Sequence, residues 1–181
     1  MTESTMLLAR ARTHTATKVL VFAIATALAA QVAIPIPGTP VPLALAPMAV
    51  VLAGLWLGPA AGAASMALYV LAGAAGLPVF APLGLPGLAR LFGPTGGYLL
   101  AYPAAAAVAG LVARRFPLTA GRIGAALLGM AVIHLGGVAQ LTLLTGSAAT
   151  GVLLGSTPFI VMDVVKACVA GAIAPRCPSR A

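Results

Sequence analysis

Apolar residues make up 61% of this 181-residue chain, and charged residues make up only 7%. Soluble domains are about 45–50% apolar and about 25% charged. The composition therefore excludes a soluble globular domain, a disordered chain and a disulfide scaffold. It predicts an all-α integral membrane protein, since a spanning helix needs about 20 apolar residues and nearly the whole length is apolar.

Six apolar runs follow one another along the chain and predict six transmembrane helices. They are residues 19–34, 43–57, 60–77, 95–113, 123–144 and 159–174. We predict a single membrane domain at residues 18–176, a cytoplasmic N-terminal tail at 1–17 and a cytoplasmic C-terminal tail at 177–181.

The segments between the runs differ in composition. Prolines at four of the positions 35–42 cannot continue a helix, so an extended segment joins the first two runs. Residues 78–94 contain four prolines and three glycines and predict an irregular loop. Residues 114–122 predict a short basic loop, and residues 145–158 a polar-leaning link.

The basic residues predict the orientation. With six spans, one side of the membrane collects Arg10, Arg12, Lys18, Arg114, Arg115, Arg122, Arg176 and Arg180. The other side has only Arg90 in its loops. Cytoplasmic loops are enriched in Lys and Arg, so we expect both termini in the cytoplasm. The net charge of +8 therefore indicates membrane orientation rather than nucleic-acid binding.

Two features near the chain ends allow more than one interpretation: the first apolar run and the two cysteines. Basic residues followed by the apolar run 19–30 resemble a secretory signal peptide, but the run continues to Ile34. Cys168 and Cys177 lie in or just beyond the last run, and no metal-ligand pattern surrounds them. We expect them to act as two thiols without a partner.

Small residues recur every fourth position in two predicted helices. Such residues let helices approach closely in lipid. In the fourth run they predict packing inside the bundle. The first run has two such registers, one containing Ala23 and Ala27, and its spare face favours contact with a partner protein.

Asp163 and Lys166 are the most informative residues. Asp163 is the only acid outside the N-terminal tail. Lys166 lies three residues later, on the same helix face. A charge inside a bilayer costs at least about 2.5–3.5 kcal/mol, so such residues are usually functional or paired. The pair favours a ligand site that opens to the outside, although a self-neutralising pair without a role is the alternative.

Arg90 lies in the only charged outer loop, shortly before Gly93-Pro94-Thr95-Gly96-Gly97-Tyr98. Thr95 is a suitable helix N-cap, and a helix N-terminus attracts anions. An anionic ligand could meet Arg90, these backbone N–H groups and Lys166. A tight turn is the simpler interpretation of the glycines.

A few other polar and aromatic residues are candidates for the ligand site. Tyr69 and Tyr98 are predicted as pocket walls or as interfacial residues, and Gln31 lies near the outer end of the first helix. We expect His134 to be hydrogen-bonded to a neighbour. The sequence shows no metal-binding cluster and no nucleophile beside a base. It also lacks a G-x-x-x-x-G-K-[ST] nucleotide motif.

Five segments of the chain together resemble the BioY family of biotin transporters. They are Ala30-Gln31-Val32-Ala33-Ile34-Pro35, Gly54 to Pro59, Leu68-Tyr69 with Ala74 to Phe80, Gly93 to Leu99, and Pro158-Phe159 with Asp163, Lys166 and Ala167. The similarity covers about residues 19–174, and its specificity comes from the order and spacing of the segments.

The resemblance implies a vitamin-binding S component of an energy-coupling factor (ECF) transporter in the bacterial cell membrane. It implies biotin as the transported ligand, no cofactor and no enzymatic activity. The implied partners are a transmembrane coupling protein, which docks on the first helix near Ala23 and Ala27, and a pair of ABC ATPases. It assigns Asp163 and Lys166 to the biotin site, and the loop from about Ile36 to Leu43 to a lid.

The chain departs from the family pattern at the lid, where Ala46-Pro47 stands in place of a polar pair. The loop that is usually glycine-rich contains Pro82 and Pro86. Three other interpretations stay open: an S component for thiamine or riboflavin, a structural membrane protein, and an intramembrane enzyme that uses His134 or Gln140 beside Asp163.

Overall fold

The computed structural model describes the backbone of residues 3–175 and the side chains of residues 13–175. The described chain forms helices and one small sheet, in the order α1 (Glu3–Gln31), β1 (Ala33–Ile34), β2 (Leu43–Ala44), α2 (Ala46–Leu57), α3 (Pro59–Ala74), α4 (Ala89–Phe92), α5 (Gly96–Arg115), α6 (Thr119–Thr145), α7 (Ala148–Gly155) and α8 (Ile160–Ile173). The predictions that involve Arg176, Cys177, Arg180 and the tail at 177–181 lie outside the described residues, as do the side chains of Arg10 and Arg12.

Each of the six predicted runs contains one apolar helix: α1, α2, α3, α5, α6 or α8. Within the described part of the chain, residues 13–31 of α1, α5 and α6 are long and apolar enough to cross a membrane alone. The α7–α8 pair, bent by 55°, meets the same criterion as one broken span, and α2 and α3 are shorter apolar helices. The structure is thus an all-α multi-pass membrane protein, as predicted.

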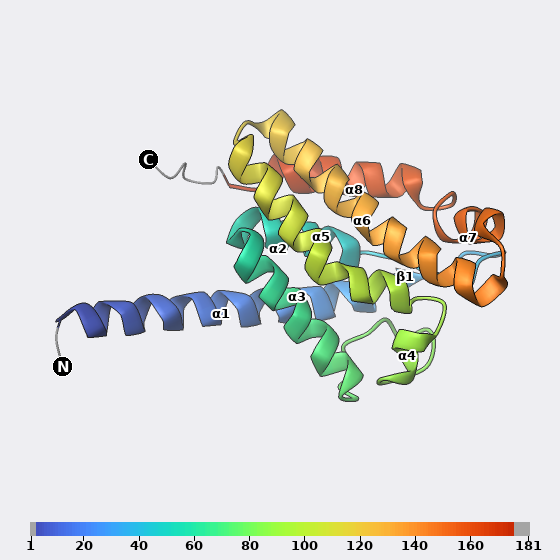
Figure 1. Ribbon diagram of the computed structural model, residues 1–181, viewed down its shortest axis with the longest axis horizontal. Coiled ribbons are helices and arrows are strands. Elements are labelled where there is room, and N and C mark those ends of the chain that lie inside the picture. The colour runs from blue at the N-terminus through green and yellow to red at the C-terminus, as the bar shows by residue number, and fades with distance from the viewer. Residues whose placement is uncertain (1–2, 176–181) are drawn as a thin grey trace.

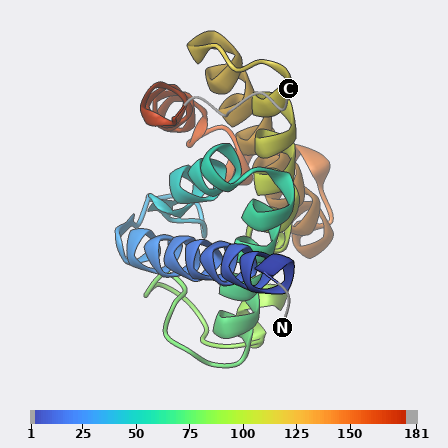
Figure 2. The same cartoon turned by 90° about the vertical axis from the view of Figure 1, so that its left-hand side faces the viewer.

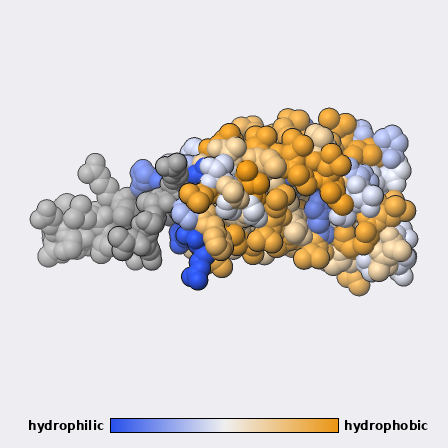
Figure 3. All heavy atoms as spheres, turned by 90° about the horizontal axis from the view of Figure 1, so that it is seen from above, coloured by the Kyte–Doolittle hydropathy of each residue, from blue (hydrophilic) through white to orange (hydrophobic). Residues whose placement is uncertain are grey.

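The N-terminal end of α1 and the C-terminal end of α8 lie at the same end of the bundle (Figure 1). The turn between α2 and α3 and the connection between α5 and α6 also lie at this end, whereas the sheet, α4 and α7 lie at the opposite end. This arrangement is what an even number of spans requires. Figure 3 shows apolar side chains over the middle of the visible face, with strongly polar groups beside the end from which α1 projects. The assignment of that end to the cytoplasm stays a prediction.

Glycine and alanine bring the central helices close together. A Cβ at Gly54 of α2 would overlap the carbonyl oxygen of Ala106 on α5, and a Cβ at Gly97 of α5 would overlap that of Gly136 on α6. Ala105 and Ala109 of α5 are fully buried. The helices therefore associate by close backbone approach, as expected in lipid. Figure 2 shows the bundle from the end from which α1 projects.

Helix α1 begins at Glu3 and runs without a break through the predicted domain boundary at residue 18, which stays a prediction. Three expectations about element boundaries were wrong. Residues 33–34 and 43–44 form an antiparallel pair instead of helix ends, because the prolines between them keep the chain extended and fold it back. The predicted link 145–158 contains α7, whose N-cap Ser147 accepts a hydrogen bond from the Thr150 amide. Arg122 lies within α6 rather than in a loop.

Candidate ligand site

A pocket of about 660 Å³, part of it open to solvent, lies at the end of the bundle opposite the chain termini. Strand β2 and the segment before it cover one side, α5, α6 and α8 form the walls, and the segment with α4 supplies Arg90. The pocket is lined by Ala30, Val41, Pro42, Leu43, Ala44, Ala46, Pro47, Tyr69, Phe80, Ala81, Arg90, Thr95, Tyr98, Leu99, Tyr102, Ile133, His134, Phe159, Asp163 and Lys166.

The acid and the amine on α8 lie on one helix face, as predicted, and form an ion pair with each other. Lys166 Nζ donates to Asp163 Oδ1 at 2.7 Å, and both residues are buried. Asp163 lies in the first turn of α8, where the helix dipole favours a negative charge. Lys166 Nζ also donates to the carbonyl oxygen of Ala44 in β2 at 2.7 Å. One ammonium group thus joins the ligand-site carboxylate to the covering strand.

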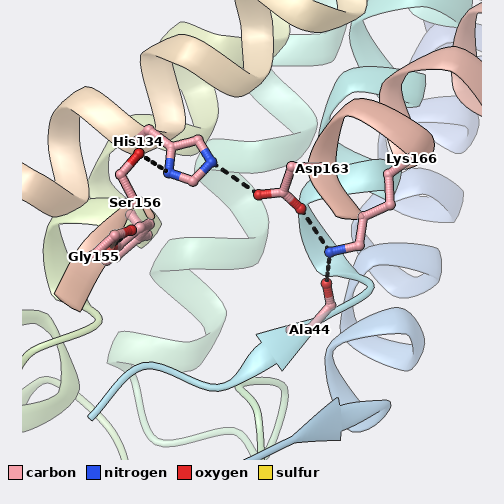
Figure 4. Close-up of polar contacts among 7 residues, drawn as sticks. Ala44, His134, Gly155, Ser156, Asp163 and Lys166 are labelled. Carbon is pink, nitrogen blue, oxygen red and sulfur yellow. Dashed lines mark hydrogen bonds and ion pairs between the residues drawn. The ribbon is translucent and has the colours of Figure 1, made fainter. Parts of the chain in front are cut away.

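The second carboxylate oxygen of Asp163 binds an imidazole. His134 Nε2 lies 2.9 Å from Asp163 Oδ2, and His134 Nδ1 lies 3.2 Å from the hydroxyl of Ser156, just after α7 (Figure 4). This confirms the expectation that His134 is hydrogen-bonded to a neighbour. The contact joins α6 to α8 across 29 positions of the sequence.

Arg90 also lines the pocket, apart from the Asp163, Lys166 and His134 contacts. Its side chain is 4% exposed, and Nη2 donates to the carbonyl oxygen of Ala81 at 2.9 Å. Its Nε–H is buried without a hydrogen-bond partner among the described residues. Burial lowers the pKa of the Arg90 guanidinium, while the hydroxyls of Tyr69 and Tyr102 raise it. An arginine nevertheless keeps its charge at physiological pH.

Aromatic rings form the apolar walls. Tyr69 stacks on Tyr102 with ring centroids 6.0 Å apart and meets Phe80 edge-on at 5.6 Å. The hydroxyl of Tyr98 donates to the carbonyl oxygen of Gly155. The sequence reading missed Tyr102, although its position four residues after Tyr98 places both rings on one helix face.

Gln31, Gly96 and Gly97 are not among the residues that line the pocket. Gln31 is exposed and does not line the pocket; its amide donates to the carbonyl oxygens of Ala27 and Phe80. Gly96 and Gly97 begin helix α5 and pack against the backbone at Leu91 and Gly136, so their missing side chains serve close packing between helices rather than a tight turn. Thr95 occupies the N-cap position of α5, but its side chain makes no capping bond.

The two alanines predicted to contact a partner face mostly inward. Ala23 is 6% exposed and belongs to the core, and Ala27 is half-buried against it. The open face of α1 instead presents Val21, Ile24 and Leu28. Docking through Ala23 and Ala27 stays a prediction.

Comparison with known proteins gives one consistent result. The BioY family matches the chain over residues 1–181. The chain belongs to the BioY family.

Named relatives agree with this membership. The chain is 43% identical over 127 residues to "Probable biotin transporter BioY" of Pyrococcus horikoshii, covering 70% of this chain and 74% of the relative. It is 37% identical over 127 residues to "Biotin transporter BioY" of Thermotoga maritima, covering 70% and 75%. A solved structure, the S-component for biotin from an ECF-type ABC transporter, is similar with a TM-score of 0.82 and 25% identity, covering 96% of this chain and 92% of that one. The family is thus one of transporter components.

Proposed function

We propose that this BioY-family chain binds biotin in the pocket and mediates biotin uptake as the substrate-binding component of an ECF-type transporter in the bacterial cell membrane. The observation that supports this most directly is the pairing of a buried carboxylate with a separate buried guanidinium inside one aromatic-walled pocket.

The polar groups of biotin match those of the pocket. The ureido ring offers two N–H donors and one carbonyl acceptor, and the tail ends in a carboxylate. Each oxygen of Asp163 accepts one hydrogen bond within the protein and keeps a free lone pair for a ureido N–H. Lys166 uses two of its three N–H donors, which leaves one for the ureido carbonyl.

The charges of the pocket also favour a singly negative ligand. Asp163 and Lys166 neutralise each other, so the positive charge of Arg90 is the excess among the described lining residues. The guanidinium of Arg90, which lines the pocket, provides the donors for the carboxylate tail. A charge-assisted bond of this kind is about twice as strong as a neutral one.

Transport requires partners that this chain does not supply. No nucleotide-binding motif occurs in the sequence, so ATP hydrolysis would come from an ABC ATPase pair through a transmembrane coupling protein. We propose docking of the coupling protein on α1, whose exposed apolar face includes Ile24 and Leu28 beside the half-buried Ala27.

The test is biotin binding by the purified protein in detergent, with mass spectrometry of any co-purified ligand. We expect wild type to bind biotin and Asp163→Asn to bind it at least about a hundredfold more weakly, because the variant loses a charged acceptor in a buried site. Cys168→Ala is the control, since Cys168 is on the same helix and exposed. Unchanged affinity in Asp163→Asn, or co-purification of a different vitamin, would refute the proposal.

A further inference from the structure

We infer that His134 is a positioning residue for Asp163, and that Ser156 holds it in the neutral tautomer with the proton on Nε2. This inference rests on the proposed function, because it states how the carboxylate is presented to the ureido group. Neither the family membership nor the names of the relatives assigns a role to His134.

The hydrogen-bond partners fix the tautomer. An ionised carboxylate only accepts hydrogen bonds, so the 2.9 Å contact to Asp163 Oδ2 requires a proton on His134 Nε2. In the neutral ring, Nδ1 is then an acceptor, and the Ser156 hydroxyl at 3.2 Å donates to it. All polar atoms of the imidazole are thereby satisfied without a charge.

Protonation of His134 would add a second excess positive charge to the pocket. The charged groups that line the pocket are Arg90, Asp163 and Lys166, with the tyrosines at 69, 98 and 102 as neutral hydroxyls. With His134 neutral, these groups sum to a single positive charge, which one ligand carboxylate balances. A protonated His134 would place a second cation against the single carboxylate of Asp163 and leave these groups with two excess positive charges.

The two anchors of Asp163 act on different oxygens. Lys166 holds Oδ1 at 2.7 Å from within α8, and His134 holds Oδ2 from α6 (Figure 4). With only one anchor, the carboxylate plane is free to turn about that bond. Two anchors on opposite oxygens fix the plane and therefore the direction of the free lone pairs. His134 thus contributes to affinity for ligand N–H donors by orienting their acceptor.

The first experiment compares two substitutions. Gln places an amide N–H near the position of Nε2, whereas Leu removes the donor. We expect His134→Leu to weaken biotin binding about ten- to hundredfold, the range for a lost hydrogen bond to a charged group. We expect His134→Gln to recover most of this loss. Leu135→Ala is the control on the same helix, since Leu135 is 70% exposed.

A structural role alone would not distinguish Gln from Leu. If His134→Leu binds biotin like wild type, or if His134→Gln loses as much affinity as His134→Leu at an unchanged melting temperature, the inference is wrong. Ser156→Ala removes only the partner of Nδ1, and we expect a two- to fivefold loss.

The second experiment does not depend on biotin. The chain contains two histidines, so ¹⁵N-histidine spectra of wild type and a His14→Gln variant assign each ring. We expect the neutral Nε2–H form of His134 at pH 7, and a mixture of tautomers in Ser156→Ala. A dominant Nδ1–H form or an imidazolium in wild type would overturn the inference. Failure of wild type to bind biotin would instead overturn the proposed function and leave this spectral result standing.

Discussion

Gly84 controls the position of Arg90, and adding one methyl group there tests the role of the guanidinium. Gly84 has φ +122°, a backbone conformation that residues with a side chain rarely adopt. A Cβ at this position would overlap Nη1 of Arg90. The overlapped atom is the far end of a flexible side chain, so the guanidinium relieves the overlap by shifting, and this shift disturbs the 2.9 Å bond from Nη2 to the carbonyl oxygen of Ala81.

The expected effect of Gly84→Ala has two parts. The positive φ costs about 1–2 kcal/mol of stability, and displacement of a charged hydrogen-bonding group costs about 1.5–3 kcal/mol. If Arg90 binds the biotin carboxylate, the second part lowers affinity by about ten- to hundredfold. Gly76→Ala is the matched control, because Gly76 has φ +99° but open space around a Cβ. It should share the loss of stability and keep wild-type affinity.

The assay is calorimetric binding of biotin and of biotin methyl ester, which lacks the negative charge. Gly84→Ala should weaken biotin binding and leave ester binding nearly unchanged, so the preference for the free acid shrinks. Equal affinities in the two alanine variants, or an equal loss for both ligands, would show that Arg90 does not meet the carboxylate.

Two further predictions concern the lid and the helix core. Thr39→Val removes the hydroxyl that donates to the carbonyl oxygen of Leu154 at 2.7 Å. Since a neutral hydrogen bond contributes about 1 kcal/mol, we expect biotin to dissociate about fivefold faster from this variant in a chase experiment. An unchanged dissociation rate would contradict a role for this hydrogen bond in keeping the pocket closed. Gly54→Ala forces α2 away from the backbone of Ala106, which should cost about 1–3 kcal/mol and lower the melting temperature. Gly124→Ala, where a Cβ meets nothing, should not lower it.

The sequence predicted those features that depend on local chemistry. Apolar runs about one membrane thickness long indicated the main helices, and proline and basic residues bounded them. The spacing of Asp163 and Lys166 by one helical turn predicted that they share a helix face, and in the structure they lie in contact at 2.7 Å. Helical periodicity alone decides such contacts, and no knowledge of the fold is needed.

Helical periodicity could not predict contacts between segments that are distant in the sequence. The bonds from Asp163 to His134 and from Lys166 to Ala44 depend on how α6, α8 and the covering strand are rotated and placed. A sequence pattern shows which face of a helix is apolar, but in a membrane protein nearly every face is apolar. The inward orientation of Ala23 was missed for the same reason, since small residues occur on both faces of α1.

The missed helix α7 illustrates how a short element connects the parts of the site. The carbonyl groups of a last helical turn have no partner within the helix and accept bonds from outside it. Leu154 accepts from Thr39 of the lid, Gly155 accepts from Tyr98 of the pocket wall, and the next residue, Ser156, bonds to the imidazole beside Asp163. Three consecutive residues therefore contact the cover, the wall and the acid network. A shift of this turn would disturb all three at once, so movement of the segment 36–43 is coupled through α7 to the groups of the proposed biotin site.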